Sequence, residues 1–166
     1  GFWSGGSSSS GWDDIEYYDS ALRFELRNQT QSNWWVAYGN FKGTWIFTAL
    51  VLKDGISYKG YVDGTAYPDG KNIGCIGDFG GGVIGRWDRE FNGSIANVQV
   101  YSSALSQNDI NALYAEGIGG APIDLQNLVG WWPLNGDAND YSGNGNNGVP
   151  SGVTFVSNWY SGYTPP

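Results

Sequence analysis

The chain has 166 residues and a net charge of −8, with 16% aromatic residues, 27 glycines and only 14% charged residues. This length suffices for one domain with one core, and abundant aromatic residues and glycine are typical of an all-β fold with many turns. The acidic charge argues against nucleic acid as a partner, and no apolar run reaches the roughly 18 residues of a membrane span. The chain has no His and only one Cys, which excludes Ser-His-Asp triads and zinc sites rich in His or Cys.

Residues 1–20 are predicted to be a flexible or partly ordered start, because serine and glycine dominate positions 5–11. Apolar and polar residues then alternate over 21–28, which predicts a half-buried strand. A second strand is expected over 33–39, after a short turn. The chain does not begin with Met, so we expect a processed product or a fragment.

Two Asp-Gly dipeptides divide the next segment. Residues 44–55 form a long predicted strand that ends at Asp54-Gly55, and residues 56–65 are expected to pair back against it and to end at Asp63-Gly64. Asp-Gly between two strands is a strong signal for a tight hairpin. This segment therefore predicts antiparallel pairing of consecutive strands.

Shorter strands are predicted over residues 72–77 and 81–87. The glycines of 77–85 are interpreted as a hairpin loop, because no Lys-Ser/Thr follows them as in a phosphate-binding loop. Residues 90–105 predict a further strand. Its alternation slips once, and we interpret the slip as a β-bulge.

One short helix is predicted over residues 106–116. Ser106 is a favourable N-cap, and Asp109 three residues later completes an acidic variant of the capping box. Gly117 stands where a helix commonly ends. One face of this helix is apolar and is expected to pack at the edge of the fold; it carries Ile110, Leu113 and Tyr114.

The strand pattern resumes after the helix, over residues 127–134, 147–150 and 152–157. Residues 128–134 are apolar on both alternating faces, which predicts an interior strand of a sheet. The tail, residues 158–166, is too aromatic for a free end, so we expect it to dock on the protein.

Several of these segments carry a resemblance to one family. The blocks W-x-x-x-A-L-V-x-x-D-G (45–55), Y-V-D-G (61–64) and F-N-G-S-I-A-N-V-Q-V-Y (91–101, continuing to 114) resemble the second half of a laminin G-like, concanavalin A-like domain. Together they cover most of residues 20–116. The stretch L-V-G-W-W-P-L-N-G-D-A-N-D-Y (128–141, continuing to 148) resembles the first strand and loop of the same family, which normally come first.

The resemblance implies an all-β fold, an antiparallel β-sandwich of the jelly-roll type with one short helix. Members of this family are mainly extracellular recognition and adhesion modules, so we expect a location outside the cell or at its surface. Similar repeats occur in microbial surface proteins, some of them pilin-like. The core is predicted to include Trp45, Ile46, Leu50, Ile95, Val98, Val100, Leu113, Val129 and Trp131.

The C-terminal position of residues 125–166 leaves three interpretations open. They belong to the next repeat of an array, or they complete this chain as a permuted single domain of residues 1–166, or they complete a neighbouring chain. A sheet that lacks a strand presents unpaired main-chain groups, which a neighbour's strand can satisfy. Repeated head to tail, such an exchange builds a filament. Removing residues 125–166 is expected to leave the remainder unfolded or insoluble if they complete the fold.

Catalysis is not expected. Some relatives implied by the resemblance are glycosidases, and Asp14 and Glu16 would point the same way if they lay on a strand. Their order, with Asp19 beyond them, does not match the glucanase pattern of Glu, Asp and Glu. We therefore interpret residues 13–20 as an acidic turn and the protein as non-catalytic.

A structural calcium ion is the one cofactor that the sequence suggests. Asp137, Asn139 and Asp140 lie in a Gly-rich loop and offer the hard oxygen ligands that Ca²⁺ prefers. The alternative is a loop of Asx turns, in which the same side chains bind their own main chain.

Aromatic residues are the candidate ligand-binding positions, because an exposed ring can stack on a sugar. In the pairs Trp34-Trp35 and Trp131-Trp132 one ring should face outward along a strand, and the tail adds two more. The alternative is that a second sheet or subunit covers these rings. The candidates are Trp34, Trp35, Trp132, Trp159 and Tyr160.

Two Asn-x-Ser/Thr sequons, at Asn28 and Asn92, are candidate glycosylation sites in a glycosylating host. Asn28 follows a strand at a turn and is the better candidate. Two functions remain: a lectin-like adhesion module that binds glycans, and a structural subunit that binds copies of itself in a head-to-tail filament.

Overall fold

A computed structural model of the chain describes residues 3–5, 12–18, 21–27, 32–38, 41–53, 57–67, 70–71, 82–85 and 91–156. The chain divides into two compact units, Gly1–Gly93 and Ser94–Pro166. The first holds β1 (Trp3–Gly5), β2 (Trp12–Tyr18), β3 (Ala21–Arg27), β4 (Ser32–Tyr38), β5 (Thr48–Lys53), β6 (Ser57–Val62), β7 (Thr65–Ala66), β8 (Gly70–Lys71) and β9 (Gly82–Ile84). The second holds β10 (Val98–Tyr101), α1 (Gln107–Glu116) and β11 (Leu128–Trp132).

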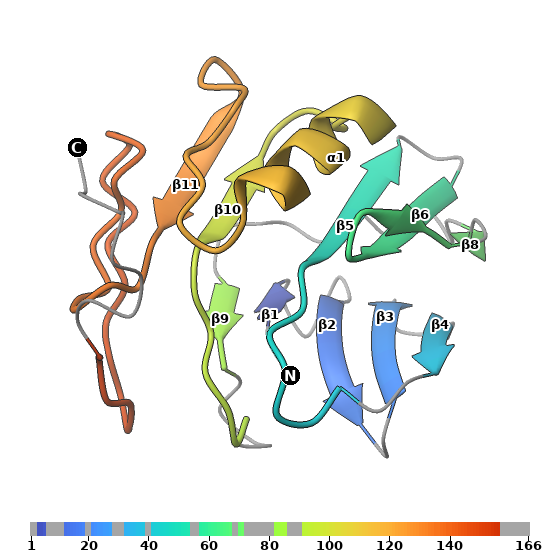
Figure 1. Cartoon of the computed structure of the whole chain (residues 1–166), viewed down its shortest axis with the longest axis horizontal. Helices are drawn as coiled ribbons and strands as arrows, with labels where there is room; N and C mark the ends of the chain where they lie inside the picture. The colour runs from blue at the N-terminus through green and yellow to red at the C-terminus, as the bar shows by residue number, and fades with distance from the viewer. Residues whose placement is uncertain are drawn as a thin grey trace. The chain divides into compact units, whose positions relative to one another are not determined.

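The first unit is a sandwich of two antiparallel sheets. One sheet has the order β4-β3-β2-β1-β9, and in the other β5, β6 and β7 are adjacent while β8 also pairs with β6 (Figure 1). Their inner faces meet in one apolar cluster, to which β3 contributes Leu22 and Phe24 and β6 contributes Tyr58 and Val62. The fold class expected from the sequence is confirmed.

Close packing between the sheets requires a glycine at one point. A Cβ atom added to Gly60 on β6 would lie 2.8 Å from Cδ2 of Phe24 on β3. The Phe24 ring therefore lies directly against the β6 main chain, and its side chain has no exposed surface. Partly buried side chains complete the cluster: Ile15, Phe41, Ile46, Leu50, Leu52 and Tyr67.

The predicted hairpins are present. β5 pairs with β6 from Thr48↔Val62 to Lys53↔Ser57, with the Asp54-Gly55 dipeptide in between but outside the described residues. At the second dipeptide Asp63 and Gly64 both have positive φ, 49° and 75°, as a two-residue hairpin turn requires. Asp63 also accepts a hydrogen bond from the Phe47 N–H at 2.9 Å and donates its own N–H to the Phe47 oxygen at 3.0 Å.

Three predicted boundaries need correction. The acidic turn expected over residues 13–20 is wrong, because residues 12–18 form β2, which pairs with β1 and β3. The long strand expected from residue 44 begins only at Thr48, after a turn over residues 42–44. Residues 147–150 and 152–156 are not strands. The strand expected over 72–77 and most of the glycine loop lie outside the described residues, whereas residues 82–84 form β9.

The second unit contains an antiparallel ribbon of β10 and β11 together with α1. The bulge predicted within residues 90–105 is wrong, because only Val98–Tyr101 of that segment form a strand. The extra residue lies on the partner strand: Val100 pairs with Gly130 and Tyr101 with Leu128, so Val129 of β11 has no pairing partner on β10. α1 begins as predicted, since the Ser106 side chain accepts the Asp109 N–H and the Asp109 carboxylate accepts the Ser106 N–H. The Ser106 hydroxyl, which donates to Asp109 Oδ2 at 2.7 Å, and the Ser106 N–H, which donates to the same oxygen at 2.8 Å, lower the pKa of Asp109.

The predicted core is largely, but not fully, confirmed. Leu113 and Trp131 are buried, Ile46 and Leu50 pack against the sandwich core, and Ile95, Val98 and Val100 are half-buried. Trp45 is 51% exposed and Val129 is 36% exposed, so both predictions are wrong. Trp45 precedes β5, and the bulge at Val129 interrupts the alternation that the prediction used. On α1 Ile110 and Leu113 are buried but Tyr114 is exposed.

Candidate functional site

The most highly organised polar region is the loop of residues 135–148, which we call the capping loop. β11 pairs with β10 along one edge, and the capping loop also binds main-chain groups of β11. The Trp131 N–H donates to Asp140 Oδ1 at 2.9 Å, and the Trp131 oxygen accepts the Tyr141 N–H at 2.8 Å. The loop therefore satisfies this edge as a neighbouring strand would.

Asparagine side chains satisfy the next two carbonyls of β11. Asn144 Nδ2 donates to the oxygens of Leu128, at 2.8 Å, and Val129, at 3.1 Å. Asn146 Nδ2 donates to the same Val129 oxygen at 2.8 Å. An exposed strand edge is a template for pairing with another chain, so these amides close a reactive edge of β11.

Asp140 organises the capping loop. Its Oδ1 accepts the N–H groups of Trp131 and Ser142, both at 2.9 Å, and its Oδ2 accepts the Asn146 N–H at 2.9 Å. Its own N–H donates to Asn147 Oδ1 at 2.9 Å. Partial burial alone would raise the pKa of Asp140, but the hydrogen bonds from Trp131, Ser142 and Asn146 outweigh it and lower the pKa.

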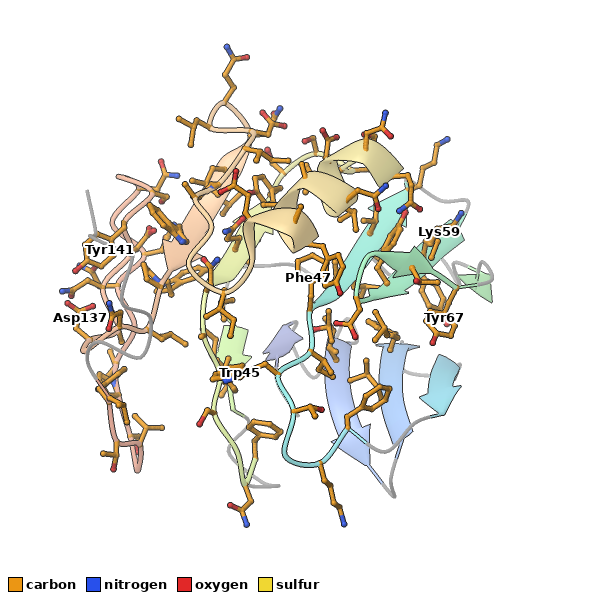
Figure 2. The ribbon with its side chains drawn as sticks, viewed as in Figure 1. Trp45, Phe47, Lys59, Tyr67, Asp137 and Tyr141 are labelled. Carbon is orange, nitrogen blue, oxygen red and sulfur yellow. The ribbon has the colours of Figure 1, made fainter. Side chains whose placement is uncertain are left out.

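Asp137 and Asn139 form a second, local group on the capping loop. Asp137 accepts hydrogen bonds from the Asn139 N–H at 3.0 Å, from Asn139 Nδ2 at 2.8 Å and from the Tyr141 hydroxyl at 3.1 Å, and Figure 2 shows Asp137 and Tyr141 close together. Desolvation and the Asp137 carboxylate raise the pKa of Tyr141.

These contacts agree with the Asx-turn interpretation of the loop. Calcium binding would need oxygens that are free to face a cation, whereas both oxygens of Asp140 already accept main-chain N–H groups. Within the described residues, no group of three or more His, Cys, Asp or Glu side chains is arranged to hold a metal ion. Calcium at Asp137, Asn139 and Asp140 stays a prediction.

A second polar row consists of Asn97, directly before β10, with Gln99 and Tyr101 on β10, and it binds the segment between α1 and β11. Asn97 Nδ2 donates to the Gly120 oxygen at 2.9 Å, and Asn97 Oδ1 accepts both Trp131 Nε1 at 2.8 Å and Gln99 Nε2 at 3.0 Å. The Tyr101 hydroxyl donates to Gln99 Oε1 at 2.6 Å, and burial raises the pKa of Tyr101 to about 12. The row is thus structural, because its amides are bound within the unit.

The adjacent tryptophans of β11 are both buried. Trp131 is 5% exposed and its ring meets Tyr141 edge to face at 6.3 Å. Trp132 is 8% exposed, donates Nε1 to the Asn146 oxygen at 2.8 Å, and covers Gly130 so closely that a Cβ there would lie 2.1 Å from the ring. The expectation that one ring of this pair faces outward is therefore wrong, and Trp132 offers no exposed face for a sugar.

The remaining candidates are spread over the first unit and the ends of the chain. Trp34 and Trp35 lie on β4, where they pair with Glu25 and Phe24 of β3. Asn92 is exposed beside a turn in which the Gly93 N–H donates to the Phe91 oxygen. Three candidates lie outside the described residues: Asn28, Trp159 and Tyr160.

Sequence reasoning missed the residues that close the β11 edge. Asn144 and Asn146 stand in a stretch, G-N-G-N-N-G, whose composition indicates only a loop. Asn97 was missed as well, although its positive φ of 52° is a conformation in which Asn is enriched. An Asn-rich loop directly after a strand that is apolar on both faces was the available signal.

No helix in the described part of the chain is long and apolar enough to cross a membrane. A family described as the concanavalin A-like lectin/glucanases superfamily, with a laminin G-like sequence model, matches residues 2–111, which run from the start of the sandwich into α1. No curated protein and no solved structure matches the chain. Since the matched residues make up most of the sequence, the chain belongs to the concanavalin A-like lectin/glucanases superfamily.

Proposed function

We propose that the protein is a non-catalytic recognition module that binds carbohydrate and acts in adhesion outside the cell or at its surface. The family and the β-sandwich support this proposal. The observation that carries it is the register of β4 on β3, because it divides the Trp34-Trp35 pair between the two faces of the sheet.

Trp35 pairs with Phe24, whose side chain is fully buried between the sheets. Trp34 pairs with Glu25. Directly paired residues share a face and successive residues alternate, so positions 24 and 35 belong to the core face and positions 25 and 34 to the opposite face. We expect Trp34 to supply the ring that meets a glycan.

A glycan array tests the proposal with two matched variants. Trp34→Ala should abolish binding while the melting temperature stays close to that of the parent chain. Trp35→Ala should lower the melting temperature, because position 35 belongs to the core face of the sheet. If the parent chain binds no glycan, or if Trp34→Ala binds like the parent chain, the proposal is wrong.

The same register bears on catalysis. Asp14 pairs with Glu25 and Glu16 with Arg23, so the two acidic positions on β2 each have a charged neighbour on β3. We propose that these positions are structural and that the protein hydrolyses no glycan. Release of reducing sugar from glycans that the array identifies, abolished by Asp14→Asn or Glu16→Gln, would contradict this.

A second candidate function, a head-to-tail structural subunit, is favoured by the segment after the capping loop. Val149 is 93% exposed, Val153 57% and Val156 65%, and residues 147–156 form no strand. β-branched residues favour strands, so this segment is suited to pair with a second copy. The expected result is concentration-dependent association in sedimentation velocity that Val153→Lys suppresses; a chain that stays monomeric at high concentration excludes this function.

A further inference from the structure

The capping loop contains three of the four Asn-Gly dipeptides in the described part of the chain. Asn followed by Gly is chemically labile, because the glycine nitrogen is unhindered and can attack the carbonyl carbon of the asparagine side chain. The four dipeptides are Asn92-Gly93, Asn135-Gly136, Asn144-Gly145 and Asn147-Gly148.

The structure makes the four sites unequal. The attacking N–H is hydrogen bonded in two of them: Gly93 donates to the Phe91 oxygen at 3.1 Å and Gly148 to the Ala138 oxygen at 2.8 Å. A bonded N–H must first lose its acceptor before it can lose its proton and attack. Gly145 makes no hydrogen bond among the described residues, and Asn144 is exposed whereas Asn135 is half-buried.

Asn144 is also the residue whose conversion would matter most for the β11 edge. Its Nδ2 donates to the Leu128 and Val129 oxygens, at 2.8 and 3.1 Å. An aspartate there would place an anionic oxygen, an acceptor without a proton, against two carbonyl oxygens. Both hydrogen bonds would be replaced by repulsion.

We propose that Asn144 is a site of spontaneous deamidation that releases the capping loop from β11 irreversibly. The deprotonated Gly145 nitrogen attacks Cγ of Asn144, an N–Cγ bond forms, the Cγ–Nδ2 bond breaks, and Nδ2 leaves as ammonia. Water then opens the five-membered imide at either carbonyl and yields aspartate or isoaspartate. The net reaction is amide plus water to carboxylate plus ammonium, with no oxidation or reduction.

The reaction opens the capping loop. Nδ2 is the leaving group, so its departure as ammonia removes the donor of both hydrogen bonds to the β11 carbonyls. The carboxylate that replaces the amide opposes reattachment, and released chains with an unprotected β11 edge accumulate with time.

Peptide mapping by mass spectrometry during incubation in mildly alkaline buffer tests the site. Asn144 should convert about five times faster than Asn92 and Asn147. At those two sites the attacking glycine N–H must first break one hydrogen bond of ordinary strength. It should also convert faster than the half-buried Asn135. If Asn144 does not convert faster than the other three, the assignment is wrong.

Hydrogen exchange on two variants tests the release. Asn144→Asp should speed exchange of the Trp131 and Ser142 amides, which the closed loop protects, and should leave β3 unchanged. Asn144→Gln, which keeps an amide donor and can close only a six-membered imide, a much slower reaction, should retain more protection than Asn144→Asp. Equal exchange in Asn144→Asp and the parent chain would show that conversion does not open the loop, and the proposal would fail.

Discussion

The two units solve the same structural problem, how to protect a β-strand, by different means. In the first unit β3 and β6 are covered by side chains, with Leu22 and Phe24 fully buried and Tyr58 1% exposed. In the second unit one edge of β11 is covered by hydrogen bonds from a single loop, arranged around the Asp140 carboxylate. The stability of an apolar core depends on the volume of its side chains. The stability of a polar cap depends on the charge of its side chains and on whether each one donates or accepts a hydrogen bond.

The largest effect is expected from Phe24→Ala in the sandwich core. It removes a fully buried ring that packs against Gly60, and such a truncation costs ~3–5 kcal/mol of unfolding free energy. Denaturant unfolding measures the loss. Val149→Ala, at a 93% exposed side chain, should change almost nothing. A loss below about 1 kcal/mol for Phe24→Ala would contradict the apolar core as the basis of the first unit.

Hydrogen exchange on the same variant sharpens the comparison. If protection falls equally at β3 and at Leu128–Trp132, the units unfold together and the predicted single domain of residues 1–166 is supported. If protection at Leu128–Trp132 is unchanged, the units unfold separately. The single domain and its permuted order stay predictions until this measurement is made.

Asp140→Asn should have the next largest effect, confined to the second unit. The change replaces one acceptor oxygen with an N–H donor that must face a main-chain N–H, which costs ~1–3 kcal/mol. Exchange of the Trp131 amide should become faster. Asn139→Ala is the matched control on the same loop, since the Asn139 side chain binds Asp137 and Tyr141 and no main-chain group of β11 among the described residues. Equal effects of the two variants would mean that Asp140 has no special role.

Ser106→Ala should cost about 1 kcal/mol, because it removes the side-chain acceptor of the Asp109 N–H at the start of α1. Exchange in the first turn of α1 reports the loss. Ser151→Ala, in the exposed segment after the capping loop, serves as the control. No difference between the two variants would show that the cap contributes nothing to α1.

Acid should weaken the capping loop selectively. The pKa of Asp140 is lowered from its ordinary value of 3.8, so the unfolded chain takes up its proton first as the pH falls. The stabilisation is therefore complete above about pH 4 and is lost as the pH falls through the lowered pKa. Protection of the Trp131 amide should decline in that range, and Asp140→Asn should remove the pH dependence. If protection of the Trp131 amide depends on pH in the same way in Asp140→Asn, another carboxylate causes the pH dependence.

Chelation should have the smallest effect. Because the Asp140 oxygens are bound by main-chain N–H groups, we expect EDTA and added Ca²⁺ to leave the melting temperature and proteolysis near Asp137 unchanged. A higher melting temperature with Ca²⁺, lost in Asp137→Asn, would instead support the calcium site that the sequence suggests.

Local interactions were predictable from the sequence alone. The Ser106–Asp109 capping box, the Asp63-Gly64 turn and the alternation that places β3 all depend on residues a few positions apart. The family resemblance could be read in the same way, from the order of short blocks that the family match over residues 2–111 confirms. Each of these features is determined by the chain's own short-range geometry.

The tertiary structure decided the features that depend on distant main chain. Sequence alternation could not show that Val129 occupies a bulge, that Trp132 folds over Gly130, or that Asp140 accepts the Trp131 N–H nine positions away. The same carboxylates and amides could bind a cation or cap a strand, and their neighbours in space decide between the two. A side chain's chemistry is fixed by its sequence, but its partner is fixed only when the fold places a donor or an acceptor opposite it.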